Sequence, residues 1–416
     1  MRFALEEINN STELLPGVIL GYDITDSCSE VVDIQAMFRF LSGKQGTEVE
    51  ILNNYTSYQP RVIAIIGPAS SEIAITIARV SGFFLIPQIS YLASAEILSD
   101  KMHFPSFFRT IPSDKNQVEA MALLIQEFRW NWIAVVGSDN EYGRNGLTKV
   151  VEMASALGTC IAYQGIISTS PEIINQVINN ISSTVNVTIL FSNKLIAQVF
   201  FSFVVAQNLA SKVWIVSEAI SLSEEITKIP RIESIGTVIG IAVKEGELTH
   251  FKEFLDKPLN HIYSGIVPGL GLGECTNNRG TCDQECNWLK AKHLNSSSPS
   301  LEKRISHNVY SAVYAVAHAL HDLLQCNATQ CDRTQSFLPW QLLSRLKTVK
   351  FNLQDYTLYF DENGDPPVGY DIVLWDWMRV GVNFKTIGSY MPATRKISIN
   401  PSLIQWNLED NLVRTL

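Results

Sequence analysis

Short apolar runs rich in β-branched residues alternate along this chain with amphipathic stretches of helical length. Residues 61–66 indicate a buried strand, residues 71–83 a helix and residues 85–90 the next strand, which together predict a β-α-β unit. Near-continuous apolar strands between helices are typical of parallel sheets that helices cover on both faces. The alternation therefore predicts an α/β fold.

The alternation continues through most of the chain. We expect helices at residues 114–129, 142–157, 305–324 and 339–346, and strands at residues 132–136, 160–166, 187–191 and 213–216. Two further strands are expected on either side of a hairpin turn at residues 361–365.

The number of strands bears on the number of folding units. About ten strands are too many for one compact doubly wound sheet with a single core, so the 416 residues are expected to form two α/β lobes. The sequence Thr-Ile-Pro-Ser-Asp at residues 110–114 interrupts the pattern and marks a seam. Residues 267–300 lose periodicity and gather Gly, Cys, Asn and Ser, which predicts a long surface insertion.

Composition narrows the class of partner. The formal net charge of -9 provides no basic field for a phosphate backbone, so nucleic acid is not an expected partner. No apolar run approaches the roughly 20 residues that a membrane span needs, so we expect the chain as given to be soluble.

Two features favour the secretory route. Asn-X-Ser/Thr acceptors for glycans occur at Asn9, Asn10, Asn54, Asn180, Asn186, Asn295 and Asn327. The seven cysteines are Cys28, Cys160, Cys275, Cys282, Cys286, Cys326 and Cys331. Five of them lie in two loop-like clusters whose spacing does not fit a zinc site, which favours disulfides. Because the count is odd, we expect at least one cysteine to have its partner outside the given sequence.

No pattern for catalysis was found. The chain has no G-x-S-x-G, Walker A or H-E-x-x-H sequence. The glycines at residues 269–273 lie in an irregular segment and not between a strand and a helix, so a dinucleotide site is not expected. His318 and His321 are spaced to share a metal, but no carboxylate or cysteine stands at ligand spacing nearby, which favours packing. We expect no enzyme activity, no cofactor and no metal.

Polar residues do follow the predicted strands. Residues 67–71 (Gly-Pro-Ala-Ser-Ser) lie between a strand and a helix, where hydroxyls and free N–H groups suit a carboxylate or phosphate, although an ordinary serine N-cap is a simpler interpretation. Residues 90–94 follow the next strand, so their polar atoms should emerge beside Ser71. On the second lobe Asp114, residues 139–142 and Glu218 follow strands or the seam and suit a cation, although each acid could instead cap a helix. A free amino acid carries both charges.

Five segments resemble the Venus-flytrap ligand-binding domain of class C G-protein-coupled receptors, and the resemblance covers nearly the whole chain. They are residues 65–71, 86–91, 98–101, 108–114 and 142–143. Within that class, residues 126–132, 137–144, 309–321, 324–329 and 339–343 are most similar to taste receptor type 1 subunits, with member 3 as the nearest match.

The resemblance implies a periplasmic-binding-protein-like fold, in which two doubly wound Rossmann-like lobes are joined by three crossovers. Lobe 1 would comprise residues 1–108 and 245–365, and would carry the dimer contact and the carboxylate side of a ligand cleft. Lobe 2 would comprise residues 109–244 and 366–416 and provide the ammonium side.

The resemblance also implies which residues contact the ligand: Ser71, Leu92, Ala93, Ser94, Asp114, Tyr142, Glu218 and Gln341. The first four would hold the α-carboxylate, while Asp114, Tyr142 and Glu218 would complete the ammonium pocket. Glutamate receptors have Lys where this chain has Gln341, which argues against a strong preference for acidic side chains. Glu218 is one methylene longer than the Asp common in those receptors.

The cysteines fit the same resemblance. Cys160 matches a cysteine that bonds to a cysteine-rich linker, and Cys28 one whose partner lies upstream. Cys326 and Cys331 are close enough in sequence to bridge each other, whereas Cys275, Cys282 and Cys286 stay unassigned.

The function implied is that of an extracellular taste-receptor domain at the plasma membrane. It would bind an L-amino acid or another small tastant, close on it, and act beside a related type 1 subunit, with a heterotrimeric G protein reached through a membrane domain. Alternatives are another class C amino-acid receptor, a solute-binding protein that delivers amino acids to a transporter, a hydrolase or dehydrogenase on the same scaffold, and a subunit that binds ligand weakly.

Overall fold

The computed structural model describes residues 1–25, 40–41, 58–182, 185–255, 299–332, 336–353, 356–378 and 381–407. Several predictions fall outside these residues: Cys28, Asn54, the glycines at 269–273, Cys275, Cys282, Cys286, Asn295 and the surface insertion up to residue 298. The last two residues of the predicted insertion, 299 and 300, form the start of a helix.

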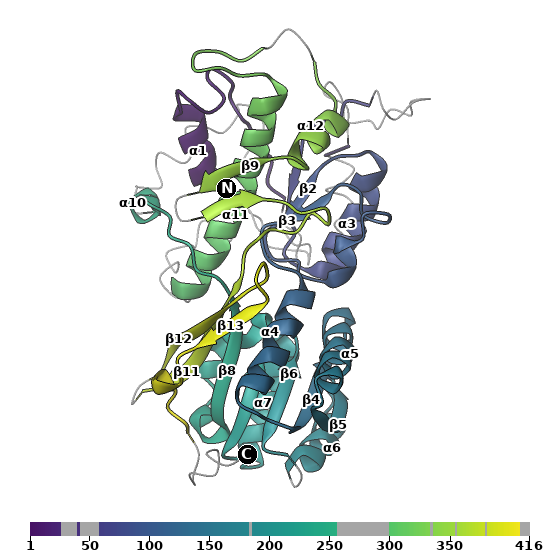
Figure 1. The fold of residues 1–416 in the computed structure, drawn as a ribbon, viewed down its shortest axis with the longest axis vertical. Helices are drawn as coiled ribbons and strands as arrows, with labels where there is room; N and C mark the ends of the chain where they lie inside the picture. The colour runs from purple at the N-terminus through teal and green to yellow at the C-terminus, as the bar shows by residue number, and fades with distance from the viewer. Residues whose placement is uncertain are drawn as a thin grey trace, which may run out of the picture.

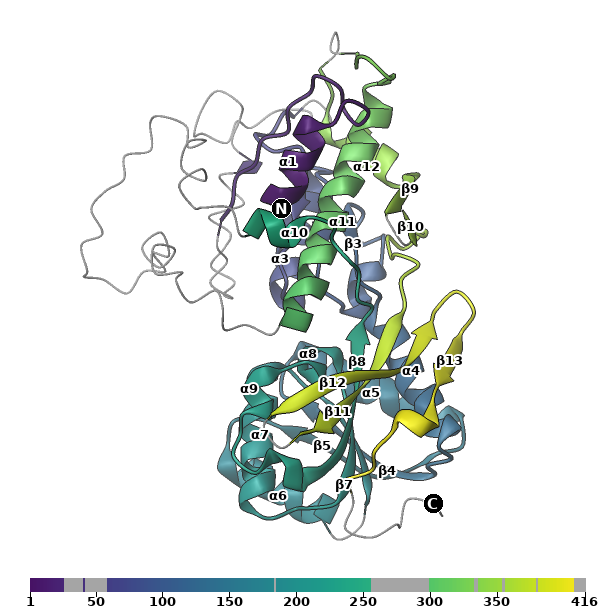
Figure 2. The same ribbon diagram turned by 90° about the vertical axis from the view of Figure 1, so that its left-hand side faces the viewer.

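Two sheets, one above the other in Figure 1, form the cores of two lobes. The upper lobe contains a three-stranded parallel sheet of β1 (Ile65–Ile66), β2 (Gln88–Ser90) and β3 (Phe107–Arg109). Its helices are α1 (Arg2–Asn10), α3 (Ser71–Phe83), α11 (Pro299–Leu323) and α12 (Pro339–Leu346), with the short α-helix α10 (Phe251–Leu255) and the short 3-10 helix η3 (Glu96–Ser99). Figure 2 shows α1 lying against α11, and both contribute buried residues to one apolar cluster.

The upper lobe corresponds to the predicted lobe 1 and the lower lobe to the predicted lobe 2. The lower lobe is built on an eight-stranded sheet of order β13-β12-β11-β8-β7-β6-β4-β5. Its strands are β4 (Trp132–Ser138), β5 (Cys160–Ile167), β6 (Val187–Phe191), β7 (Lys212–Val216), β8 (Gly236–Val243), β11 (Tyr370–Trp377), β12 (Val382–Met391) and β13 (Lys396–Ile399). Strands β4 to β8 are parallel, and β11 to β13 extend the sheet in antiparallel pairing. The helices are α4 (Asp114–Glu127), α5 (Glu141–Ala156), α6 (Pro171–Ser182), α7 (Lys194–Ala206), α8 (Glu218–Ser221) and α9 (Glu224–Thr227), with the turns η4 (Ile232–Ile235) and η9 (Pro401–Leu403).

The lower sheet is covered on both faces, as its apolar strands predicted. In β4, Ile133 and Val135 pack into one buried cluster with α4 and α5 residues, whereas Ala134 and Val136 pack into the other with α6 and α7 residues. Side chains alternate between the two faces of a strand, so a continuous apolar run fills both layers.

The chain passes between the two lobes three times: from β3 to α4, from β8 to α10 and from β10 (Tyr356–Tyr359) to β11. The predicted fold class, two doubly wound α/β lobes joined by three crossovers, is therefore confirmed. The residue boundaries that we assigned to the lobes stay a prediction.

The hairpin predicted at residues 361–365 is wrong. Strand β10 (Tyr356–Tyr359) pairs with β9 (Lys350–Leu353), which precedes it, and the strand after the turn, β11, belongs to the sheet of the other lobe. The turn therefore leads into a crossover. An apolar run shows where a strand lies but does not show its partner. Strand β2 is also shorter than expected: it begins at Gln88, directly after Pro87, which has no N–H group to donate to a neighbouring strand.

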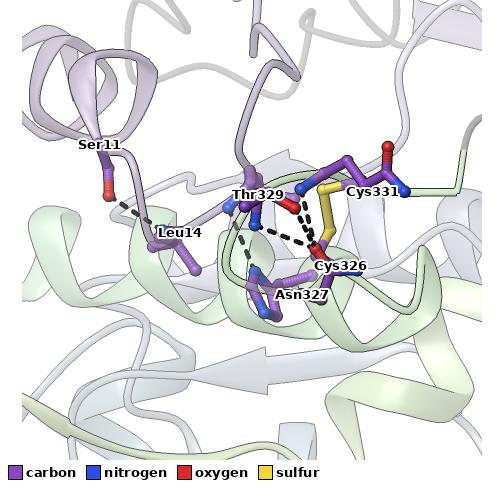
Figure 3. The surroundings of a disulfide bond; sticks show 9 residues. Ser11, Leu14, Cys326, Asn327, Thr329 and Cys331 are labelled. Carbon is purple, nitrogen blue, oxygen red and sulfur yellow. Dashed lines mark hydrogen bonds between the residues drawn. A yellow bond between two sulfur atoms is a disulfide. The ribbon is translucent and has the colours of Figure 1, made fainter.

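Helix α11 ends in a loop that is closed by a disulfide between Cys326 and Cys331, as Figure 3 shows. Within that loop the Oδ1 atom of Asn327 accepts hydrogen bonds from the N–H groups of Thr329 and Gln330. The predicted pairing is confirmed. Cys160 is exposed and free. None of the helices in the described ranges is long and apolar enough to cross a membrane.

Candidate functional site

Two hydroxyl-bearing loops of lobe 1 are joined to each other at the ends of β1 and β2. Ser90 Oγ donates to the carbonyl of Pro68 at 2.6 Å and accepts from the N–H of Ala93 at 2.9 Å. Ser71 Oγ accepts from the N–H of Ala95 at 3.2 Å. The N-cap of α3 is Ser70, so the Ser71 hydroxyl does not cap its own helix. The two loops lie side by side, as expected of neighbouring parallel strands.

The loop after β2 is partly closed on itself. Ala93 and Ser94 are buried, Leu92 is half-buried, and the Ala93 N–H already has Ser90 Oγ as its acceptor. A carboxylate that used this N–H would replace an existing hydrogen bond. Sequence reasoning assigned no role to the Ser90 side chain, because nothing in the residue pattern shows that it turns back onto its own loop.

A buried arginine, Arg109, is hydrogen-bonded to the same loop. Arg109 at the end of β3 is fully buried; its Nε donates to Asp365 Oδ1 at 2.6 Å, and its Nη1 donates to the carbonyl of Ala95 at 3.0 Å. It also donates to Ser99 Oγ. Asp365 in turn belongs to the turn held by Asp361, whose Oδ1 accepts from the N–H of Asp365. The charged end of an otherwise apolar strand was a signal for such a pair that sequence reasoning did not use.

Asp114 begins α4 at the crossover from lobe 1 to lobe 2. Its N–H donates to the carbonyl of Ser94 at 2.8 Å, and its Oδ1 accepts from Gln117 Nε2 at 2.9 Å. Burial raises the pKa of Asp114 to about 6, against the opposing effects of the Ser94 hydroxyl, the Arg109 charge and Gln117. Ionisation of a buried acid is costly while no cation is bound beside it. A bound cation therefore stabilises the ionised form of such an acid strongly.

Glu218 is the second acid of this cluster and begins α8, directly after β7. Burial raises the pKa of Glu218 to about 7, the negative charge of Asp114 raises it further, and the positive charge of Arg304 opposes both. Glu218 as a residue is half-buried. The N–H of Glu218 donates to Gln117 Oε1 at 2.7 Å.

Two phenols complete the surroundings of the acids. Tyr142 on α5 packs against Phe191, with ring centroids 4.6 Å apart. Burial, followed by the charges of Asp114 and Glu218, raises the pKa of Tyr142 well above its usual value, so the phenol stays protonated. Tyr370 on β11 has its pKa raised by the same causes, and its hydroxyl donates to the carbonyl of Pro112 at 3.2 Å. Sequence reasoning missed Tyr370, which arrives from a strand distant in the chain.

Asp114, Gln117, Tyr142, Glu218 and Tyr370 thus form one group, which we call the carboxylate cluster. Asp114 connects it to the loop that carries Ser94, so the structure brings the predicted carboxylate-binding and ammonium-binding residues next to each other.

Gln341 differs from the other predicted residues in what it contacts. Its Oε1 accepts from the N–H of Leu338 at 2.8 Å, at the start of α12. The side chain stabilises the first turn of its own helix, and its contact with a ligand stays a prediction.

A separate pocket of about 220 Å³ lies in lobe 1 and contains none of the predicted ligand residues. Its walls are Lys101, Phe108, Lys347, Phe360, Asp361, Glu362 and Gly364. The Lys101 ammonium donates to the carbonyl of Phe107, and burial lowers its pKa to about 8. Charged residues of both signs line this pocket.

His318 and His321, whose spacing would allow a shared metal, have other partners. The ring of His318 stacks on Phe351 with centroids 4.1 Å apart, and burial lowers its pKa to about 4. His321 Nδ1 accepts from the N–H of Leu15 at 3.2 Å. Within the described ranges no three His, Cys, Asp or Glu side chains gather as a metal site would require.

Comparison with known families assigns the chain to a family. Residues 1–378 match the family described as "Receptor family ligand binding region". The chain belongs to this family of receptor ligand-binding regions. The match includes both sides of the carboxylate cluster and all but the last strands of lobe 2.

Curated relatives narrow the family further. Human taste receptor type 1 member 1 is 39% identical and human taste receptor type 1 member 3 is 37% identical, each over 99% of this chain and 49% of the relative. Mouse taste receptor type 1 member 1 is 38% identical over 99% of this chain and 49% of its own length. The chain therefore spans about half the length of the curated relatives it matches. These relatives are named as receptors and not as enzymes. Members 1 and 3 match almost equally, so the nearest member stays a prediction.

Proposed function

We propose that this chain is the extracellular ligand-binding domain of a taste receptor type 1 subunit, and that it binds a free L-amino acid between its lobes without covalent chemistry. The observation that carries the proposal is that the buried Asp114 and the half-buried Glu218 lie together beside the hydroxyl-bearing loop of Ser94. The similarity to taste receptors supports it.

The charges favour a zwitterion. Two carboxylates whose ionisation is opposed by burial and by each other are stabilised when an ammonium group lies between them. The adjacent Ser71 and Ser94 hydroxyls and the amides of Leu92 and Ala93 would hold the carboxylate of the same molecule. Each charge-assisted hydrogen bond contributes about 1.5–3 kcal/mol, so several of them support micromolar to millimolar affinity.

Binding residues come from both proposed lobes, 1–108 with 245–365 and 109–244 with 366–416. A ligand that contacts both favours closure only by the difference between its affinities for the closed and open forms. In the proposed receptor, closure passes to a membrane domain and its heterotrimeric G protein, beside a related type 1 subunit at the plasma membrane. The glycan acceptors within the described residues are all exposed: Asn9, Asn10, Asn180, Asn186 and Asn327.

The test is the melting temperature of the purified domain across the twenty common L-amino acids. We expect at least one of them to raise it in a concentration-dependent way, and we expect Ser71→Ala and Asp114→Asn to reduce the rise. Ser202→Ala, which changes an exposed hydroxyl on α7, is the matched control and should keep it. The absence of a shift with every amino acid would refute amino-acid binding, and turnover of a substrate would refute a receptor function.

A further inference from the structure

One buried amide joins the two acids of the carboxylate cluster. Gln117 lies three residues after Asp114 on α4, and its side chain is fully buried. Its Nε2 donates to Asp114 Oδ1 at 2.9 Å, and its Oε1 accepts from the N–H of Glu218 at 2.7 Å. Both ends of the amide are therefore used, each on a different acid.

The two connections are of different kinds. Asp114 and Gln117 share one face of α4 because residues three apart on a helix are neighbours. Glu218 is 101 residues further along the chain and begins another helix, α8. A single side chain thus links the start of α4 to the start of α8.

We infer that Gln117 is a positioning residue of the ammonium pocket: it orients the Asp114 carboxylate and holds the start of α8 so that Asp114 and Glu218 face one cation. This inference rests on the proposed function and adds a residue to it. Gln117 acts through the two acids and need not contact the ligand.

The chemistry of the contacts requires an amide. The Asp114 carboxylate needs a donor, whereas the N–H of Glu218 needs an acceptor, and Gln provides both from one side chain. An ionised Glu at this position would keep the acceptor but lose the donor and place a third negative charge in the cluster. A Met would fill a similar volume but leave the N–H of Glu218 without this acceptor.

Other charges face the same acids. Asp114 is influenced by Arg109 and Glu96, and Glu218 by Asp114 and Arg304. Gln117 also lies within hydrogen-bonding range of the Tyr142 phenol, together with Ser217. A substitution of Gln117 leaves Arg109, Glu96 and Arg304 in place but also removes its contact with Tyr142, so a double-mutant cycle is needed to assign its effect to the acids.

The first arm of the test is calorimetric binding of L-alanine to the purified domain and its Gln117→Met and Gln117→Glu variants. We expect Gln117→Met to weaken binding about tenfold and Gln117→Glu to weaken it further. Gln126→Met, the same chemical change at an exposed position on the same helix, should leave the affinity unchanged.

A double-mutant cycle separates positioning from a general loss of structure. Because Gln117 is inferred to act through Asp114 and Glu218, Gln117→Met should cost less affinity in the Asp114→Asn background than in the wild type. Combined with Ser71→Ala, on the carboxylate side of the ligand, it should cost its full effect. Equal penalties in both backgrounds would overturn the inference.

The second arm needs no ligand. The carboxyl carbons of Asp114 and Glu218 are titrated by NMR in the wild type and in Gln117→Met. Loss of the Gln117 donor removes a hydrogen bond to the ionised Asp114, so its titration midpoint should rise. An unchanged midpoint, or wild-type affinity in Gln117→Met, would overturn the inference alone. If the wild type binds no amino acid at all, the proposed function fails and the ammonium role of Gln117 fails with it.

Discussion

At the scale of single residues, the raised pKa of Asp114 has a consequence for stability. Its folded-state pKa of about 6 lies above its usual value of 3.8 because the carboxyl group is buried. Below the usual value the acid is protonated in both the folded and unfolded chain, so burial costs nothing. As the pH rises through the folded-state pKa, the folded protein must bury a charge and loses stability.

We therefore compare Glu218→Gln with Glu218→Gln/Asp114→Asn, so that the neighbouring acid titrates in neither protein. Near neutral pH the double variant should unfold at a higher temperature than the single variant. Its free energy of unfolding should be larger by up to about 3 kcal/mol, at roughly 1.36 kcal/mol per pKa unit. The difference should shrink as the pH falls and vanish near pH 4. A difference in melting temperature that does not change with pH would contradict the buried-charge explanation.

At the scale of elements, Arg109 and Asp365 tie the loop after β2 to the turn that leads into the third crossover. The side chains are 0% and 12% exposed, respectively. Removing one partner of a buried pair leaves a charge without compensation and costs about 3–5 kcal/mol. Arg109→Met should lower the free energy of unfolding in urea by that amount, whereas Arg109→Met/Asp365→Asn should lose less.

The exposed pair of Arg144 and Asp139 is the matched control. Its side chains are 58% and 43% exposed, and such pairs contribute about 0–1 kcal/mol. Arg144→Met should therefore change stability by less than about 1 kcal/mol. An equal loss at the two sites would mean that burial does not decide the effect.

The elements also show how far sequence reasoning reached. Strand β6 and helices α3 and α12 were predicted with the observed bounds. A continuous apolar run marks β6, and a serine or proline at the first turn marks the start of each helix. The partner of β10 could not be predicted, since strand pairing depends on contacts that no local pattern contains. The partners of Gln117 and Arg109 could not be predicted for the same reason: Glu218 and Asp365 are distant in the chain.

At the scale of the whole molecule, Arg304 connects lobe 1 with two of the three crossovers. It lies on α11 and is 4% exposed. Its Nη1 donates to Asp371 Oδ2 at 2.7 Å, at the start of β11, and to the carbonyl of Val243 at the end of β8. Its Nη2 donates to Glu245 Oε2 at 3.3 Å, just past β8. Because these contacts join α11 to two crossovers, they restrain rotation of one lobe relative to the other.

Arg304→Met should therefore loosen the crossovers before it disturbs either lobe. Amide hydrogen exchange should become faster at residues 243–245 and 370–371, while the central strand β6 keeps its protection, because opening free energies differ between cooperative units of one fold. Lys303→Met is the matched control: Lys303 is the adjacent residue, 64% exposed, and its Nζ lies 4.0 Å from Glu245 Oε1. Faster exchange throughout lobe 2 in Arg304→Met would mean that Arg304 stabilises the whole lobe, and unchanged exchange at the crossovers would mean that it does not restrain their motion.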